Sequence, residues 1–102
     1  MVQKKIKLVL WSKNAENQYY EILNYLLQEA LEAIEIVGNA ILDEVESLAT
    51  RYNHYAVDWF KKNNDGTYRA STILSYRISY QVGVSAVNII RVRHSSRDPL
   101  PY

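Results

Sequence analysis

The sequence has no cysteine, only three glycines and two prolines, and no long apolar run. Without cysteine the chain cannot form disulfides, thiolate nucleophiles or zinc–cysteine sites. The glycines are Gly38, Gly66 and Gly83, and this wide separation excludes a glycine-rich loop that would hold a phosphate. Since no apolar run reaches the roughly 18 residues of a membrane span, we expect no membrane partner.

Histidine is also scarce, because His54 and His94 are the only two. Neither stands at a spacing from Asp or Glu that is typical of a metal site, so we expect no metal and no cofactor. The first residues are MVQKKIKLVLW, which are basic and then apolar, as in a signal peptide. The apolar part is short and interrupted by charge, and no small-residue cleavage site follows, so we predict a strand there.

The length of the chain indicates the number of domains, and its charge distribution indicates the kind of partner. A chain of 102 residues can bury one hydrophobic core, which predicts a single domain over residues 1–102. The net charge of +1 conceals an asymmetry: residues 1–50 carry four lysines and eight acids, whereas residues 51–102 carry eight basic residues and three aspartates. This split indicates either an anionic partner for the second half or acidic helices that complement a basic sheet.

The first half of the chain predicts one strand and two helices. Residues 5–11 (KIKLVLW) alternate between lysines and the apolar Ile6, Leu8 and Leu10, which is typical of a strand with one buried face. Ser12 is a suitable N-cap for the helix that follows. Two apolar stripes at helical spacing come next: Ala15, Tyr19, Ile22, Leu23 and Leu26, then Ile34, Val37, Ile41, Val45 and Leu48. A break near Gln28–Leu31 would let two antiparallel helices share one core.

The second half predicts a loop and three strands. Residues 51–65 have no sustained period and indicate a loop with at most one short helical turn. The runs 67–74, 75–82 and 86–94 are separated by short breaks with Ser and Gly, which favours an antiparallel meander. The predicted fold is therefore α+β, in the order β-α-α-β-β-β, with a helical hairpin packed on one face of an antiparallel sheet.

The basic residues of the second half concentrate on the predicted strands. Because neighbouring strands of a meander run in opposite directions, Arg77 should meet His94 and Arg97 at one edge of the sheet. Arg69 is nearer the start of its own strand, and only the register decides whether it joins them. With possible stacking partners in Tyr76, Tyr80 and Tyr102, an anion-binding or nucleic-acid-binding site would comprise Arg69, Arg77, Arg91, Arg93 and Arg97. The alternative is an ordinary solvated strand face with half-buried tyrosines.

Four stretches together resemble the RelE/ParE superfamily of bacterial toxins. They are WSKNAE (11–16), TYRAS (67–71), SYRISYQV (75–82) and IIRVRHSSRDP (89–99). The resemblance implies a small α+β toxin of a type II toxin–antitoxin module in the bacterial cytoplasm, with a growth-inhibiting and plasmid-stabilising or stress-linked role. It also implies a cognate antitoxin whose C-terminal segment wraps around the toxin in a hetero-oligomeric complex.

The superfamily has two branches with different targets. RelE-like members cleave mRNA in the ribosome without a metal, and for this branch Arg77 and Arg97 match arginines that act on the phosphate. Arg69 matches a basic position on the preceding strand, whereas a second basic position falls near Ser71, which is not basic. Tyr102 stands near a C-terminal tyrosine of some ribonucleases, one residue closer to Arg97 than expected, and His94 could serve as acid or base.

ParE-like members bind DNA gyrase and inhibit it without known nuclease chemistry. The long helical stripes and the ending His-Ser-Ser-Arg-Asp-Pro resemble this branch. The small net charge is also modest for a protein that must contact ribosomal RNA. The sequence therefore favours gyrase inhibition, with ribosome-dependent mRNA cleavage as the alternative.

Overall fold

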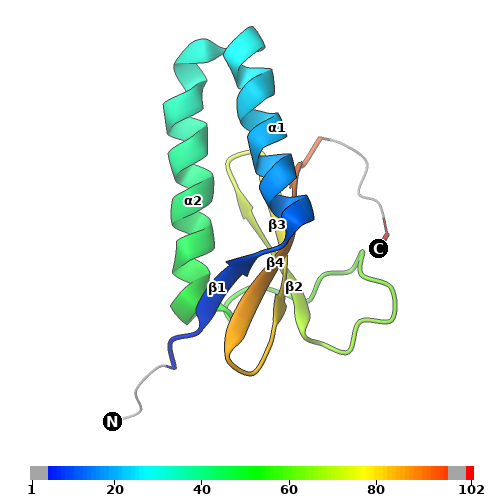
Figure 1. The fold of residues 1–102 in the computed structure, drawn as a ribbon. Coiled ribbons are helices and arrows are strands. Elements are labelled where there is room, and N and C mark those ends of the chain that lie inside the picture. Colours follow the sequence, from blue (N-terminus) through cyan, green and yellow to red (C-terminus); the bar gives the residue numbers. More distant parts are fainter. Residues whose placement is uncertain (1–4, 97–100) are drawn as a thin grey trace.

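The computed structural model describes residues 5–96 and 101–102 and shows helices on one side of a sheet (Figure 1). The elements in chain order are β1 (Leu8–Trp11), α1 (Lys13–Glu29), the 3₁₀ turn η1 (Leu31–Ala33), α2 (Ile34–Arg51), β2 (Tyr68–Ile73), β3 (Tyr76–Val82) and β4 (Ala86–His94). This confirms the predicted α+β class and the order β-α-α-β-β-β.

The strands form one sheet in the spatial order β1-β4-β3-β2 over the described residues. β2, β3 and β4 make the predicted antiparallel meander, with Thr72 opposite Arg77 and Arg77 opposite Arg93. The N-terminal strand adds a parallel pair at the edge, because β1 runs in the same direction as β4. The sheet is thus mixed rather than purely antiparallel.

The two helices form the predicted hairpin. Ser12 caps α1, since its side chain accepts a hydrogen bond from the backbone N–H of Ala15 at 3.0 Å. The chain turns through η1, which lies at the break expected near Gln28–Leu31. The helices approach closely at Gly38, where the Tyr19 hydroxyl donates to the glycine carbonyl at 3.1 Å. The far end of the hairpin extends beyond the sheet (Figure 1).

The buried core lies between this hairpin and the sheet. Its members are apolar or aromatic side chains from both helices and from β3 and β4: Ala15, Tyr19, Ile41, Val45, Leu48, Tyr76, Ile78, Tyr80, Val87, Ile89 and Val92. These residues include half of the two predicted helical stripes, and Ile22, Leu23 and Val37 of the stripes pack against them, which confirms that both stripes face one core. No helix in the described part of the chain is long and apolar enough to cross a membrane.

The buried face of β1 is the opposite of the one that its sequence pattern indicates. Val9 and Trp11 pack against the core, whereas Leu8 and Leu10 are 68% and 50% exposed. Lys7 can lie on the same side as Val9 and Trp11 because its ammonium group donates to the carbonyls of Gly83 and Val84 at 2.7 Å each. The lysine holds the strand at the sheet edge without being exposed itself, so charge is a poor guide to orientation here.

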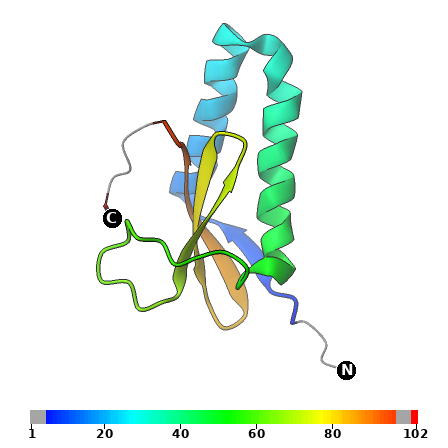
Figure 2. The ribbon, with the colours of Figure 1, turned by 180° about the vertical axis from the view of Figure 1, so that it is seen from behind.

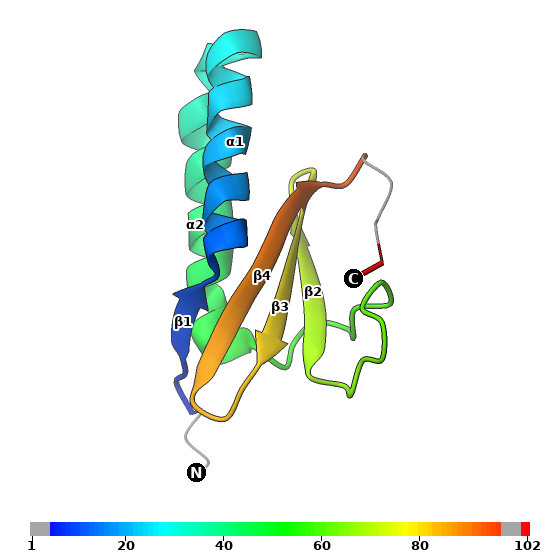
Figure 3. The same cartoon turned by 45° about the vertical axis from the view of Figure 1, so that its right-hand side comes forward.

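The loop between α2 and β2 passes along the β2 edge of the sheet, from the side of the helices to the opposite face. Figure 2 and Figure 3 show residues 52–67 leaving the end of α2 and reaching the side of the sheet opposite the helices. Asp58 N–H donates to the Tyr68 carbonyl at 2.8 Å, and Val57 forms a bridge with Arg69. The predicted loop is therefore correct, and its residues Asp58 and Phe60 lie on the sheet face that carries the arginines.

Candidate functional site

Three arginines lie on the sheet face away from the helices. In a strand, successive side chains point to opposite faces, and residues directly opposite one another share a face. Arg77 stands opposite Arg93, and Arg91 stands opposite Ser79. Ile78 and Val92, their neighbours in sequence, are buried against the helices. Arg77, Arg91 and Arg93 therefore share the helix-free face, which we call the arginine face.

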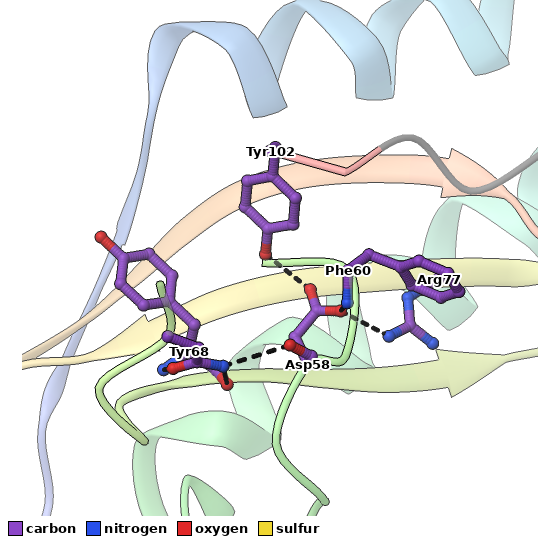
Figure 4. A network of polar contacts seen from close by, with 6 residues as sticks. Asp58, Phe60, Tyr68, Arg77 and Tyr102 are labelled. Atoms are coloured by element: carbon purple, nitrogen blue, oxygen red, sulfur yellow. Dashed lines mark hydrogen bonds and ion pairs between the residues drawn. The ribbon is translucent and has the colours of Figure 1, made fainter. Parts of the chain in front are cut away.

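A buried carboxylate from the loop reaches this face. Asp58 is 1% exposed, and its Oδ1 accepts hydrogen bonds from Arg77 Nη2 at 2.7 Å and from the Phe60 backbone N–H at 3.1 Å. Its Oδ2 accepts a hydrogen bond from the Tyr102 hydroxyl at 2.6 Å (Figure 4). Both oxygens of the carboxylate are thus occupied, and the ion pair joins the loop to β3.

Tyr102 is bound to the loop through its backbone as well as its side chain. Its N–H donates to the Phe60 carbonyl at 2.9 Å, and its own carbonyl accepts from the Lys62 N–H at 2.6 Å. The Arg91 guanidinium lies over the phenol ring, 4.0 Å from the ring centre, which is close enough for a cation–π interaction. The ring therefore covers part of the arginine face.

These contacts decide the ionisation of the central groups. Burial alone would raise the pKa of Asp58, but the hydrogen bonds from Tyr102, Arg77 and Phe60 outweigh burial and hold the pKa below its usual value. Burial raises the pKa of Tyr102, and the hydrogen bond to Asp58 raises it further. Burial also lowers the pKa of Arg91, although arginine stays protonated in proteins. At neutral pH the site holds an aspartate anion and a neutral phenol.

His94 lies at the same end of the sheet as Arg77, as predicted. The register pairs it with Tyr76, and the two rings meet edge to face at 5.1 Å between centres. Its Nδ1 faces Ser96, whose backbone N–H donates to it at 3.1 Å. The Tyr76–His94 pair is therefore next to the Arg77–Arg93 pair in the sheet, and Nδ1 of His94 acts as a hydrogen-bond acceptor.

Arg69 does not join the other arginines. It stands opposite Tyr80, near the far end of β3, and therefore lies on the face that carries the buried Tyr80. Its Nη1 donates to the Tyr55 carbonyl at 2.5 Å, so the guanidinium fastens the loop to β2. The register therefore does not place Arg69 in the predicted anion-binding group with Arg77. Arg97, predicted beside Arg77, lies outside the described residues, as do Asp98 and Pro99.

The arrangement as a whole can bind an anion more readily than it can transfer a proton. Arg77 is paired with a carboxylate, and the Tyr102 hydroxyl donates a hydrogen bond to the same carboxylate. A phenol held in its neutral form by such a bond is a poor general base near neutral pH. In the described ranges 5–96 and 101–102, no group of three or more His, Asp or Glu side chains could hold a metal ion.

Comparison with known proteins identifies relatives of this architecture. Residues 9–99 match the family model described as "ParE toxin of type II toxin-antitoxin system, parDE". No curated protein matches in sequence. Among solved structures, the chromosomal ParDE toxin–antitoxin system from P. aeruginosa superposes with a TM-score of 0.69 at 16% identity, covering 88% of this chain and 97% of that chain. The toxin–antitoxin complex RelBE2 from Mycobacterium tuberculosis gives a TM-score of 0.58 at 13% identity, covering 93% and 98%.

Proposed function

Because the chain belongs to the ParE toxin family of type II toxin–antitoxin systems, we propose that it arrests bacterial growth by binding and inhibiting DNA gyrase. The family match spans nearly the whole chain and makes it the toxin component of such a system. Both structural neighbours come from toxin–antitoxin pairs, so a cognate antitoxin is its expected partner. Gyrase and the ribosome both act in the cytoplasm, so we expect the toxin to act there and to contribute to plasmid stabilisation.

The choice of target rests on one observation: the polar groups that a ribonuclease would need already form hydrogen bonds within the chain. Cleavage of RNA without a metal requires a base for the 2′-OH, cationic stabilisation at phosphorus and an acid for the leaving oxygen. Here Arg77 and Tyr102 are both bound to Asp58, and Arg69 is fastened to Tyr55 on the other face. Ser71, near the position where the nuclease branch has a second basic residue, is buried.

The exposed apolar surface also supports a protein target. Several large apolar side chains at the end of the helical hairpin are more than half exposed, and they are Tyr25, Leu27, Leu31 and Ile36. Exposed apolar residues that gather on one projecting element are typical of protein-binding surfaces. An RNA-binding surface would instead be expected to place cations there, because phosphate contacts dominate that affinity.

Two assays on the same purified toxin test the proposal. We expect the toxin to block gyrase supercoiling of a relaxed plasmid at stoichiometric concentration, and the antitoxin to restore supercoiling. We expect intact mRNA in a ribosome-dependent translation reaction analysed by primer extension. Fragmented mRNA with normal supercoiling would contradict the proposal and favour the RelE-like alternative. In that alternative, Arg77→Ala or Arg97→Ala would reduce cleavage by orders of magnitude.

The variant Tyr102→Phe sharpens the comparison. It removes the hydroxyl while keeping the ring under Arg91. A gyrase inhibitor with this site should keep its inhibitory activity when the folded fraction is held equal. In that case the hydroxyl only stabilises the fold, through its hydrogen bond to Asp58, and takes no part in a reaction. A ribonuclease that used the phenol as an acid or base would lose cleavage even when fully folded.

A further inference from the structure

The end of the helical hairpin that projects past the sheet exposes a group of apolar side chains (Figure 1, Figure 3). Tyr25 and Leu27 lie near the end of α1, Leu31 lies in η1, and Ile36 lies in the first turn of α2. Their exposed fractions are between 57% and 68%. Single exposed apolar residues are ordinary in soluble proteins, but several on one projecting element are typical of an interaction surface. We call residues 25–36 the hairpin end.

The hairpin end is also acidic. It exposes the carboxylates of Glu29, Glu32 and Glu35, and no Lys or Arg occurs anywhere in residues 14–50. In the part of the chain that the structure describes, none of the three carboxylates forms an ion pair. Glu29 lies in the last turn of α1, where the helix dipole is negative and a cation would be favourable. A partner that brings cations would therefore balance charges that the chain itself leaves unbalanced.

The combination of apolar and acidic side chains decides which occupant fits the hairpin end. A second copy of the chain, docked through the same surface, would place like charges against each other, which is unfavourable across an interface. An anionic membrane surface and the phosphates of a nucleic acid would repel the carboxylates for the same reason. A protein surface that has apolar depressions with Lys or Arg around them matches both features.

We propose that the hairpin end docks on a cationic, partly apolar surface of DNA gyrase. This inference rests on the proposed function and identifies the part of the toxin that contacts the target. An enzyme that binds DNA exposes Lys and Arg, because the duplex carries one negative charge per about 1.7 Å of its axis. Leu31 and Ile36 would enter apolar depressions of that surface, and the carboxylates of Glu32 and Glu35 would pair with cations around them.

Binding of the purified toxin to purified gyrase, measured by biolayer interferometry at several salt concentrations, tests the inference. The affinity of the wild-type toxin should fall as salt is added, because salt screens the attraction between opposite charges. Leu31→Ser and Ile36→Ser should each weaken binding about tenfold or more, since each removes an apolar side chain that the complex would bury. Val84→Ser makes a similar change at the exposed turn between β3 and β4 and should leave the affinity within about twofold.

Two double variants test the choice of a cationic surface. Glu32→Gln combined with Glu35→Gln should weaken binding about threefold or more and should make the affinity less dependent on salt. Asp43→Asn combined with Glu46→Gln removes the same charge from exposed positions of α2 outside the hairpin end, and it should change the affinity by less than about twofold. All substituted residues are exposed, and circular dichroism would confirm that each variant is folded.

The possible results separate this inference from the proposed function. If the wild-type toxin inhibits supercoiling and the hairpin-end variants bind gyrase as tightly as Val84→Ser, the inference is overturned and the proposed function stands. A wild-type toxin that neither binds nor inhibits gyrase overturns both. Variants that lose the antitoxin but keep gyrase assign the hairpin end to the antitoxin, and a toxin dimer that Leu31→Ser dissociates in analytical ultracentrifugation assigns it to a second copy. Either of these results overturns the inference.

Discussion

The substitution Asp58→Asn tests the energetic role of the buried carboxylate. Asparagine has nearly the same shape, so it removes the charge and leaves the packing almost unchanged. Its amide oxygen can still accept the Phe60 N–H bond. The bonds from Arg77 and Tyr102 become bonds to a neutral group or are lost.

The magnitude follows from these contacts. A hydrogen bond that involves a charged group contributes about 1.5–3 kcal/mol, compared with about 1 kcal/mol for a neutral one. Breaking a fully buried ion pair costs about 3–5 kcal/mol, but the Arg77 side chain is 27% exposed and can recover some hydration. We therefore expect a loss of about 2–3 kcal/mol in the free energy of unfolding. For a domain of this size, that corresponds to a decrease of roughly 10–20 °C in Tm.

The assay is urea denaturation followed by circular dichroism, with Asp43→Asn as the matched control. Asp43 is exposed on α2, so the same chemical change there should alter stability by less than about 0.5 kcal/mol. An effect of Asp58→Asn no larger than that of Asp43→Asn would refute the reasoning.

The same prediction has a defined pH dependence. The pKa of Asp58 is lower in the folded state, so its contribution is complete above the unfolded pKa of about 4 and is lost as pH falls through the folded pKa. The stability difference between wild type and Asp58→Asn should therefore shrink between pH 7 and about pH 2. A difference that stays constant over this range would mean that the charge is not responsible.

The remaining predictions concern Tyr102, Tyr80 and Gly38. Tyr102→Phe leaves Asp58 one donor short and should cost about 1–3 kcal/mol in urea denaturation, and a cost below 0.5 kcal/mol would show that the bond is unimportant. Burial raises the pKa of Tyr80 to about 12, so ultraviolet titration should find this phenol protonated well above pH 10, and stability should be lost as pH rises toward that value; ionisation near pH 10 in the folded state would contradict its burial. Gly38→Ala normally favours a helix by about 1 kcal/mol, but the new Cβ would lie 3.2 Å from the Tyr19 hydroxyl, so we expect a net loss of up to about 2 kcal/mol by thermal melting rather than a gain.

Much of the fold could be predicted because it depends on local patterns. The helical stripes, the Ser12 cap and the alternation within 75–82 each reflect a period or a short-range hydrogen bond. The break between the helices was also visible, since one uninterrupted helix would have been unusually long. The orientation of β1 was predicted wrongly, because Lys7 satisfies its ammonium group on two carbonyls that lie 76 and 77 residues away.

The candidate site was only partly predictable. Antiparallel pairing correctly brought Arg77 to the same end of the sheet as His94. Asp58 was missed because the loop that carries it has no period, and the one available signal was an acid within the apolar stretch AVDWF (56–60). Which face Arg69 occupies could not be read without the register, since a shift of one residue reverses every side chain.

The sequence by itself determined the element order, the two helical faces and the identity of a basic strand end. These depend on residues within a few positions of one another, where spacing alone sets direction. Only the tertiary structure decided that a loop carboxylate would lie under Arg77, that Tyr102 would cover Arg91, and that Arg69 would face away. Those contacts join residues that are 11, 14 and 19 positions apart in the chain, and their geometry depends on strand register and on burial, which no local pattern encodes.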